Sequence, residues 1–134
     1  MAKLTEIEGI GPVYAEKLTA VGVRSCEQLL AKGATRAGRE ELVEKSGIEM
    51  ARILKWVNHA DLCRIKGVAG QYAELLEAAG VDSVPELAQR SAANLTVKMR
   101  EVNREKKLVR AVPAEKAVTT WVAQAKELPR VVMH

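Results

Sequence analysis

The feature that most constrains the fold of this chain is an internal match. Residues 4–29 align with residues 62–87 without a gap, and 12 of the 26 aligned pairs are identical. A second match follows a seven-residue insertion, where residues 53–60 align with 118–125 and Trp56 faces Trp121. Chance does not produce such agreement, so the sequence predicts a duplicated unit, with one copy at 1–61 and the other at 62–134.

The composition predicts helices rather than sheets. Aromatic residues make up only 3% of the 134 residues and Phe is absent, so the 48% of apolar residues that build the core are mainly Leu, Val, Ile and Ala. No segment shows sustained alternation of apolar and polar residues, which is the pattern of a half-buried strand. We therefore predict an all-α protein, and the length of the chain fits two units packed as one compact body.

Helix boundaries are marked clearly in the first copy. Pro12 suits the first position of a helix and Gly22 suits its end, which predicts a helix over 12–21. Ser25 and Thr35 are good N-cap residues for the next two helices, and Gly47 closes the second of these. A last helix, from about Glu49 to Ile65, is expected to continue into the second copy and to be shared by both units.

The second copy shows the same kind of boundaries. Ser83 precedes a short helix, Ser91 precedes a longer one that reaches about Lys107, and Pro113 and Pro129 flank the last. Together with the first copy, this pattern predicts about five helices in each unit.

A glycine turn precedes the helix at Pro12. Leu4 and Ile7 mark a turn of helix that breaks at Gly9-Ile10-Gly11, where glycine allows positive φ and close backbone approach while Ile10 fills the space between helices. The segment IEGIGPVYAEKL resembles the helix-hairpin-helix motif. Nearly the whole chain is similar to a family of uncharacterised bacterial proteins with two such units, chiefly in GVAGQYAELLEAAGVDSVPELA and REVNREKKLVRAVP. The resemblance implies tandem SAM-like units, although Ala69 replaces the second glycine in copy two and Gly70 follows it.

The resemblance also implies binding of double-stranded DNA without sequence preference. Such a hairpin can offer backbone N–H groups to a phosphate at the start of the following helix, where the helix dipole favours an anion. The residues expected to do so are Gly9, Ile10 and Gly11 in the first copy and Gly67, Val68 and Gly70 in the second. The alternative is that these residues form a tight turn and touch no ligand.

The two copies differ in net charge. Residues 1–61 carry nine Lys or Arg and nine Asp or Glu, whereas residues 62–134 carry twelve and eight, which accounts for the whole net charge of +4. The first hairpin has Glu6 and Glu8, which repel phosphate, and Lys17 is its nearest cation. Cations flank the second hairpin at Arg64 and Lys66.

The densest basic segment lies further along the second copy. Its six cations are Lys98, Arg100, Arg104, Lys106, Lys107 and Arg110. On a continuous helix Arg100, Arg104 and Lys107 share a face, and they are the expected phosphate contacts. A solvated helix surface is the alternative explanation of the same residues.

Nothing in the sequence suggests catalysis. The acidic residues are scattered, His59 stands alone, and no phosphate loop, nucleophile elbow or metal-ligand spacing is present. We therefore expect no enzyme activity, metal, cofactor or small-molecule substrate, with Cys26 and Cys63 as small buried groups. With no apolar span or signal segment, a cytoplasmic protein without membrane contact is expected. A second functional class remains open, namely a module that binds another protein and no nucleic acid.

Overall fold

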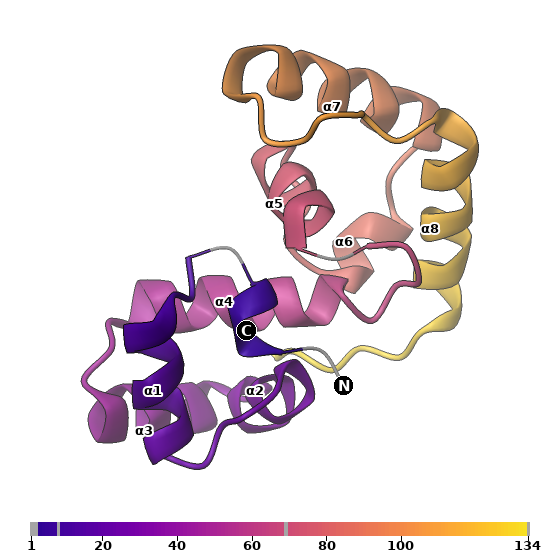
Figure 1. Ribbon diagram of the computed structural model, residues 1–134. Helices are drawn as coiled ribbons and strands as arrows, with labels where there is room; N and C mark the ends of the chain where they lie inside the picture. Colours follow the sequence, from indigo (N-terminus) through magenta and orange to yellow (C-terminus); the bar gives the residue numbers. More distant parts are fainter. Residues whose placement is uncertain (1–2, 8, 69, 134) are drawn as a thin grey trace. The chain divides into compact units, whose positions relative to one another are not determined.

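The computed structural model describes residues 3–7, 9–68 and 70–133 of the chain (Figure 1). Across these residues it contains eight α-helices, one short 3₁₀ turn and no strand. The only β-type pairing among them is an isolated antiparallel bridge between Lys3 and Ser25. The all-α class predicted from the sequence is confirmed.

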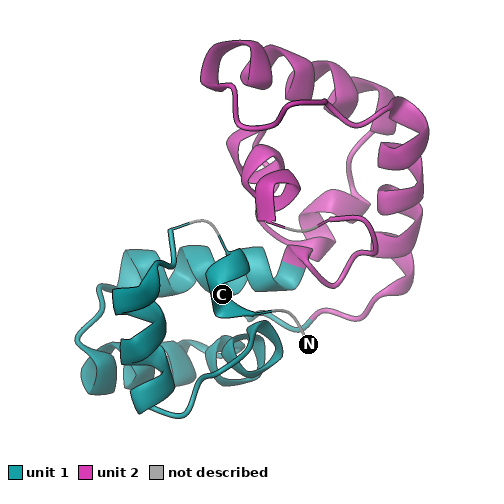
Figure 2. Cartoon of the chain, in the orientation of Figure 1, with its two compact units in different colours: residues 1–61, 131–134 teal, residues 62–130 magenta. Residues whose placement is uncertain are grey.

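The helices fall into two compact units, which Figure 2 distinguishes by colour. Unit 1 contains residues 1–61 together with the C-terminal segment that starts at Val131, and unit 2 contains residues 62–130. The sequence-based division assigned everything after Asp61 to the second copy. The structure differs because Val132 is buried in the core of unit 1 and the Met133 N–H donates to Ala34 O at 2.7 Å.

Within its described residues, unit 1 is built from one 3₁₀ turn and four helices, and several helix ends carry the expected local signals. The Ser25 and Thr35 side chains accept hydrogen bonds from the N–H groups of Gln28 and Gly38 at 3.2 and 3.1 Å. Gly47 has φ +75°, and its N–H donates to Val43 O, which completes the C-terminus. The elements are η1 (Leu4–Glu6), α1 (Pro12–Ala20), α2 (Cys26–Gly33), α3 (Arg36–Ser46) and α4 (Met50–Leu62).

Unit 2 has four helices within its described residues, so the prediction of five is wrong for this half. The helix expected to reach Ile65 ends at Leu62, after which the Ile65 N–H donates to Leu62 O at 3.1 Å in a turn. Ser83 and Ser91 act as N-caps, as expected. The helices are α5 (Gly70–Ala78), α6 (Val84–Ala88), α7 (Ala92–Lys106) and α8 (Glu115–Glu127).

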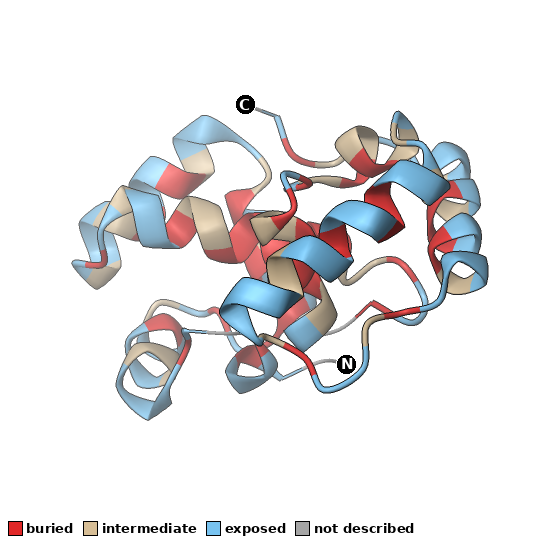
Figure 3. Cartoon of the chain, turned by 90° about the horizontal axis from the view of Figure 1, so that it is seen from above, coloured by how far each residue is buried: buried red, intermediate tan, exposed pale blue. Residues whose placement is uncertain are grey.

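Each unit has its own apolar core. Figure 3 shows helices that are exposed along one side and buried along the other. Leu18, Leu29 and Ile53 are fully buried in unit 1, and Leu76 and Leu87 in unit 2. As the composition predicts, most of the residues in both cores are aliphatic.

Candidate nucleic-acid interface

The turn that the sequence analysis expects as the first hairpin connects η1 to α1. Gly9 has φ +93°, a conformation that strongly favours glycine, whereas Gly11 has φ −86° and open space where a Cβ would lie. Only the first glycine of the motif is therefore required by the backbone. The replacement of the second glycine by Ala in copy two concerns position 69, which lies outside the described residues.

Ile10 does not face a ligand. Its side chain is buried in the core of unit 1, and its N–H donates to Ile7 O at 3.1 Å. Val68 repeats this arrangement in unit 2, where its side chain is buried and its N–H donates to Ile65 O at 3.1 Å. Both residues hold the turn together, and neither N–H is available to a phosphate.

The first turn of α1 is flanked by two cations. The Lys17 Nζ lies 5.8 Å and the Arg52 Cζ 5.1 Å from the centre of the Tyr14 ring. Pro12 has no N–H, and the N–H groups of Val13 and Tyr14 have no recorded acceptor within the described part of the chain. Arg52 comes from α4, so the sequence around the hairpin held no sign of it.

In the second hairpin a side-chain amide holds the peptide backbone of Lys66. Gln124 Oε1 accepts from the Lys66 N–H at 2.9 Å, and Gln124 Nε2 donates to Lys66 O at 3.3 Å. Gly67 follows with φ +93°, the same value as Gly9. The backbone N–H of Lys66 is therefore already used, and only its exposed side chain can reach a phosphate.

Arg64 is also engaged within unit 2. Its Nη2 donates to Pro129 O at 2.7 Å, and the residue is half-buried. This contact ties the segment after α8 to the start of the unit. Arg64 therefore has a structural contact that the sequence did not predict.

The basic segment does not form one helix face. Lys98, Arg100 and Arg104 are exposed on α7, but Lys107 lies beyond the helix end with φ +52°. The expected alignment of Lys107 with Arg100 is therefore wrong, because the chain leaves the helix at Lys107. None of the six cations makes an ion pair or side-chain hydrogen bond within the part of the chain that the structure describes.

The loop after α7 carries two of these cations to the start of α5. Asn103 fixes the loop, since its Nδ2 donates to Val109 O at 3.0 Å and its Oδ1 accepts from the Val109 N–H at 2.9 Å. The Tyr72 hydroxyl donates to Ala111 O at 3.3 Å. An open groove of about 560 Å³ lies here, and it is lined by Gln71, Tyr72, Lys107, Leu108, Val109, Arg110 and Ala111.

We call this hollow the α5 groove. Gln71 and Tyr72 belong to the first turn of α5, which directly follows the second hairpin. The structure thus brings part of the basic segment, Lys107 and Arg110, to the hairpin helix. Arg100 and Arg104 lie on α7 and do not line the groove.

All four aromatic side chains are packed against one another in pairs. The Tyr14 and Trp56 ring centres are 5.1 Å apart, and those of Tyr72 and Trp121 are 5.6 Å apart. Both Trp residues are at least 96% buried. The Tyr14 and Tyr72 rings are half-buried, and each has a Trp ring against it.

Other kinds of site find little support among the described residues. No group of three or more His, Cys, Asp or Glu within them is arranged to hold a metal ion. No helix among them combines the length and apolar character needed to cross a bilayer. Cys26 is buried and Cys63 is half-buried, and neither forms a disulfide.

Residues 8–128 match the family described as Domain of unknown function (DUF4332). The match spans most of the chain, and the chain belongs to this family. No curated protein and no solved structure matches it.

Proposed function

We propose that this chain is a tandem helix-hairpin-helix protein that binds the backbone of double-stranded DNA without sequence preference. The observation that carries the proposal is the α5 groove, where Lys107 and Arg110 flank the first turn of the helix that follows the second hairpin. A helix N-terminus bears a partial positive charge and exposed N–H groups. Two unpaired cations beside it make a suitable environment for a phosphate.

Equivalent backbone geometry supports the tandem arrangement. Gly9 and Gly67 share φ +93°, and Gly22 and Gly80 have φ +89° and +97°. The N–H groups of Val23 and Val81 bond to the carbonyls of Leu18 and Leu76 at 2.9 and 2.8 Å. Positions 58 residues apart therefore follow the same local path.

The aromatic packing favours a duplex over a single strand. Proteins that hold single strands commonly stack bases on aromatic rings, a contact worth about 1–3 kcal/mol per base. Here Tyr14 and Tyr72 are half-buried and each ring packs against a Trp, which leaves less ring surface for a base. The proposed contacts go to phosphates, which position a protein on DNA without reading its sequence.

Unit 2 provides the stronger contact in this proposal. In unit 1 two exposed cations of α3 are already paired, Arg36 with Glu40 at 3.2 Å and Lys45 with Glu41 at 2.6 Å. The basic segment of unit 2 has no such pairs within its described surroundings. Unit 1 adds the weaker site at α1, where Lys17 and Arg52 lie beside Tyr14.

The test is fluorescence anisotropy with a labelled duplex at several salt concentrations. The double variant Lys107→Gln, Arg110→Gln is compared with Lys116→Gln, Lys126→Gln, which removes the same charge from exposed positions on α8 outside the groove. Each lost phosphate contact lowers the slope of log K against log salt by about 0.9, so the groove variant is expected to lose about two in slope.

Three results would count against the proposal. Equal losses in the groove variant and its control would show that only net charge matters. Absence of duplex binding by the wild type even at low salt would leave the second class, a protein-interaction module. Binding that is tighter to a single strand of equal length than to the duplex would contradict the choice of ligand.

A further inference from the structure

Arg39 is a buried cation in unit 1. Only 3% of the residue is exposed, although it carries a guanidinium that stays charged at all ordinary pH values. Burial lowers the pKa of Arg39 below its usual value, and the nearby charge of Arg36 lowers it further. The charge of Glu40, the smallest of the three effects, acts in the opposite direction.

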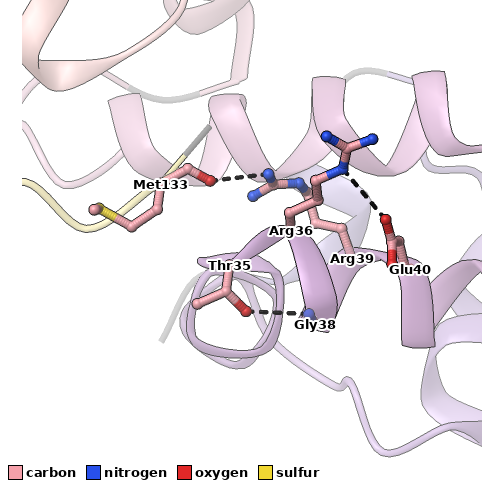
Figure 4. A network of polar contacts seen from close by, with 6 residues as sticks. All are labelled: Thr35, Arg36, Gly38, Arg39, Glu40 and Met133. Carbon is pink, nitrogen blue, oxygen red and sulfur yellow. Dashed lines mark hydrogen bonds and ion pairs between the residues drawn. The ribbon is translucent and has the colours of Figure 1, made fainter.

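The partners of Arg39 are carbonyl oxygens. Its Nη1 donates to Gly33 O at 2.8 Å and Ala34 O at 3.3 Å, at the C-terminus of α2, and its Nη2 donates to Met133 O at 2.9 Å. Figure 4 shows the guanidinium reaching Met133 while that of Arg36 turns to Glu40. The negative end of the α2 dipole offsets part of the charge.

Among the described residues, Arg39 lacks two kinds of partner. A guanidinium has five N–H donors, and at least two of these have no recorded acceptor within residues 3–7, 9–68 and 70–133. No carboxylate of those residues lies within ion-pair distance of it. Burying a charge without a counter-charge costs free energy, which a bound anion would recover.

A hollow gives access to this side chain. It has a volume of about 260 Å³ and is lined by Arg36, Arg39, Met50 and Leu54. Arg36 and Arg39 come from α3, and Met50 and Leu54 from α4. The hollow is therefore lined by two arginines and two apolar residues.

We propose that this hollow binds a carboxylate attached to a short apolar group. The planar fork of a guanidinium matches a carboxylate in two parallel hydrogen bonds, which are about twice as strong as neutral ones. Met50 and Leu54 would cover the hydrocarbon part of the ligand, and the volume limits that part to a few carbon atoms. A free acid and the C-terminal carboxylate of a peptide share this chemistry. The site lies in unit 1 and does not depend on DNA binding.

Glu40 acts against the ligand in this arrangement. It holds the exposed guanidinium of Arg36 at 3.2 Å and places a negative charge near the hollow. Its removal should therefore tighten binding of a carboxylate. A change with this sign separates a carboxylate site from an apolar hollow, where Glu40 would have no effect.

The test is a titration of the full chain with isovalerate, followed by the side-chain Nε–H signals of arginine in NMR spectra. Isovaleramide, which has the same shape and no charge, is the matched ligand control. We expect a saturable shift of the Arg39 signal and a dissociation constant for the acid about tenfold below that of the amide, a ratio worth about 1.4 kcal/mol. Tripeptides that end in valine, with a free or an amidated C-terminus, form the second arm and show which source of carboxylate is preferred.

Exposed variants keep the test independent of folding. Arg36→Gln should weaken isovalerate binding several-fold and Glu40→Gln should strengthen it. Lys45→Gln removes a charge from the same helix, outside the hollow, and should leave it unchanged. Equal affinity for acid and amide, or no shift of the Arg39 signal up to about 50 mM ligand, would overturn the proposal.

Discussion

Gly67 lies directly against the indole of Trp121, so closely that a Cβ at position 67 would be 2.9 Å from Nε1 of the ring. Gly9 has the same contact with Trp56, since a Cβ at position 9 would lie 3.3 Å from Nε1 of that indole. Each of these two glycine turns is thus packed on the Trp of the last helix in its own unit. This contact explains why glycine occupies the first position of both turns, in addition to the positive φ.

Substitution of Gly67 by Ala should destabilise the protein by about 1–3 kcal/mol, because a side chain is strained at this φ and would contact Trp121. Gly67→Ala should cost at least as much as Gly9→Ala, since the space at Gly67 is tighter. Gly11→Ser is the control, because Gly11 has an ordinary φ and Ser is a good N-cap. Urea denaturation measures the free energy of unfolding of all three variants. A loss of stability in Gly11→Ser as large as that in Gly67→Ala would contradict the explanation.

Gln124→Leu should lower the free energy of unfolding by about 1–3 kcal/mol, because it removes both hydrogen bonds to the Lys66 backbone. Gln124→Glu keeps an acceptor for the Lys66 N–H and loses the donor, so it should fall between the wild type and Gln124→Leu. Urea denaturation curves rank the wild type, Gln124→Glu and Gln124→Leu by their free energy of unfolding. If Gln124→Leu were as stable as the wild type, the amide contact would have no structural role.

Ser25→Ala and Ser83→Ala should each lower the free energy of unfolding by about 1 kcal/mol. Each removes a hydroxyl that accepts a hydrogen bond from an N–H in the first turn of its helix. Thr120→Ala also removes a hydroxyl, but this one bonds to Lys116 O within its own helix and is exposed. That variant should change stability little. Thermal unfolding would refute the prediction if all three variants behaved alike.

Lys66→Glu should weaken duplex binding more than Lys17→Glu. Lys66 is exposed and belongs to residues 62–134, which carry the whole net charge of +4. Lys17 lies over the ring of Tyr14, and residues 1–61 have no net charge. Anisotropy titrations at one salt concentration compare the two. Equal small effects would show that the hairpins take no part in binding.

Val132→Ala should destabilise the protein by about 1–3 kcal/mol, because the Val132 side chain is 97% buried in the core of unit 1. Met133→Ala is the control, since the Met133 side chain is exposed and the structural contacts of this residue are made by its backbone. Circular dichroism during urea denaturation measures both. A neutral Val132→Ala would mean that the C-terminal segment contributes nothing to unit 1.

The local features of the fold could be predicted from the sequence. Pro12, Ser25, Thr35 and Gly47 mark real helix ends because caps and positive φ depend on residues within one turn. The limits of that reasoning appear at Lys107. The helical pattern placed it beside Arg104, but the left-handed conformation of Lys107 ends α7 and sends the chain toward α5.

The glycine turns at Gly9 and Gly67, the caps and the all-helical class were determined by the sequence itself, since each follows from the conformational preferences of neighbouring residues. Only the tertiary structure decided that Gln124 holds Lys66, that Arg52 reaches Tyr14, and that Arg39 is enclosed by Gly33 and Met133. These contacts join residues from separate segments, several of them far apart in the chain. Their side chains meet only after the helices have packed, so no local pattern records them.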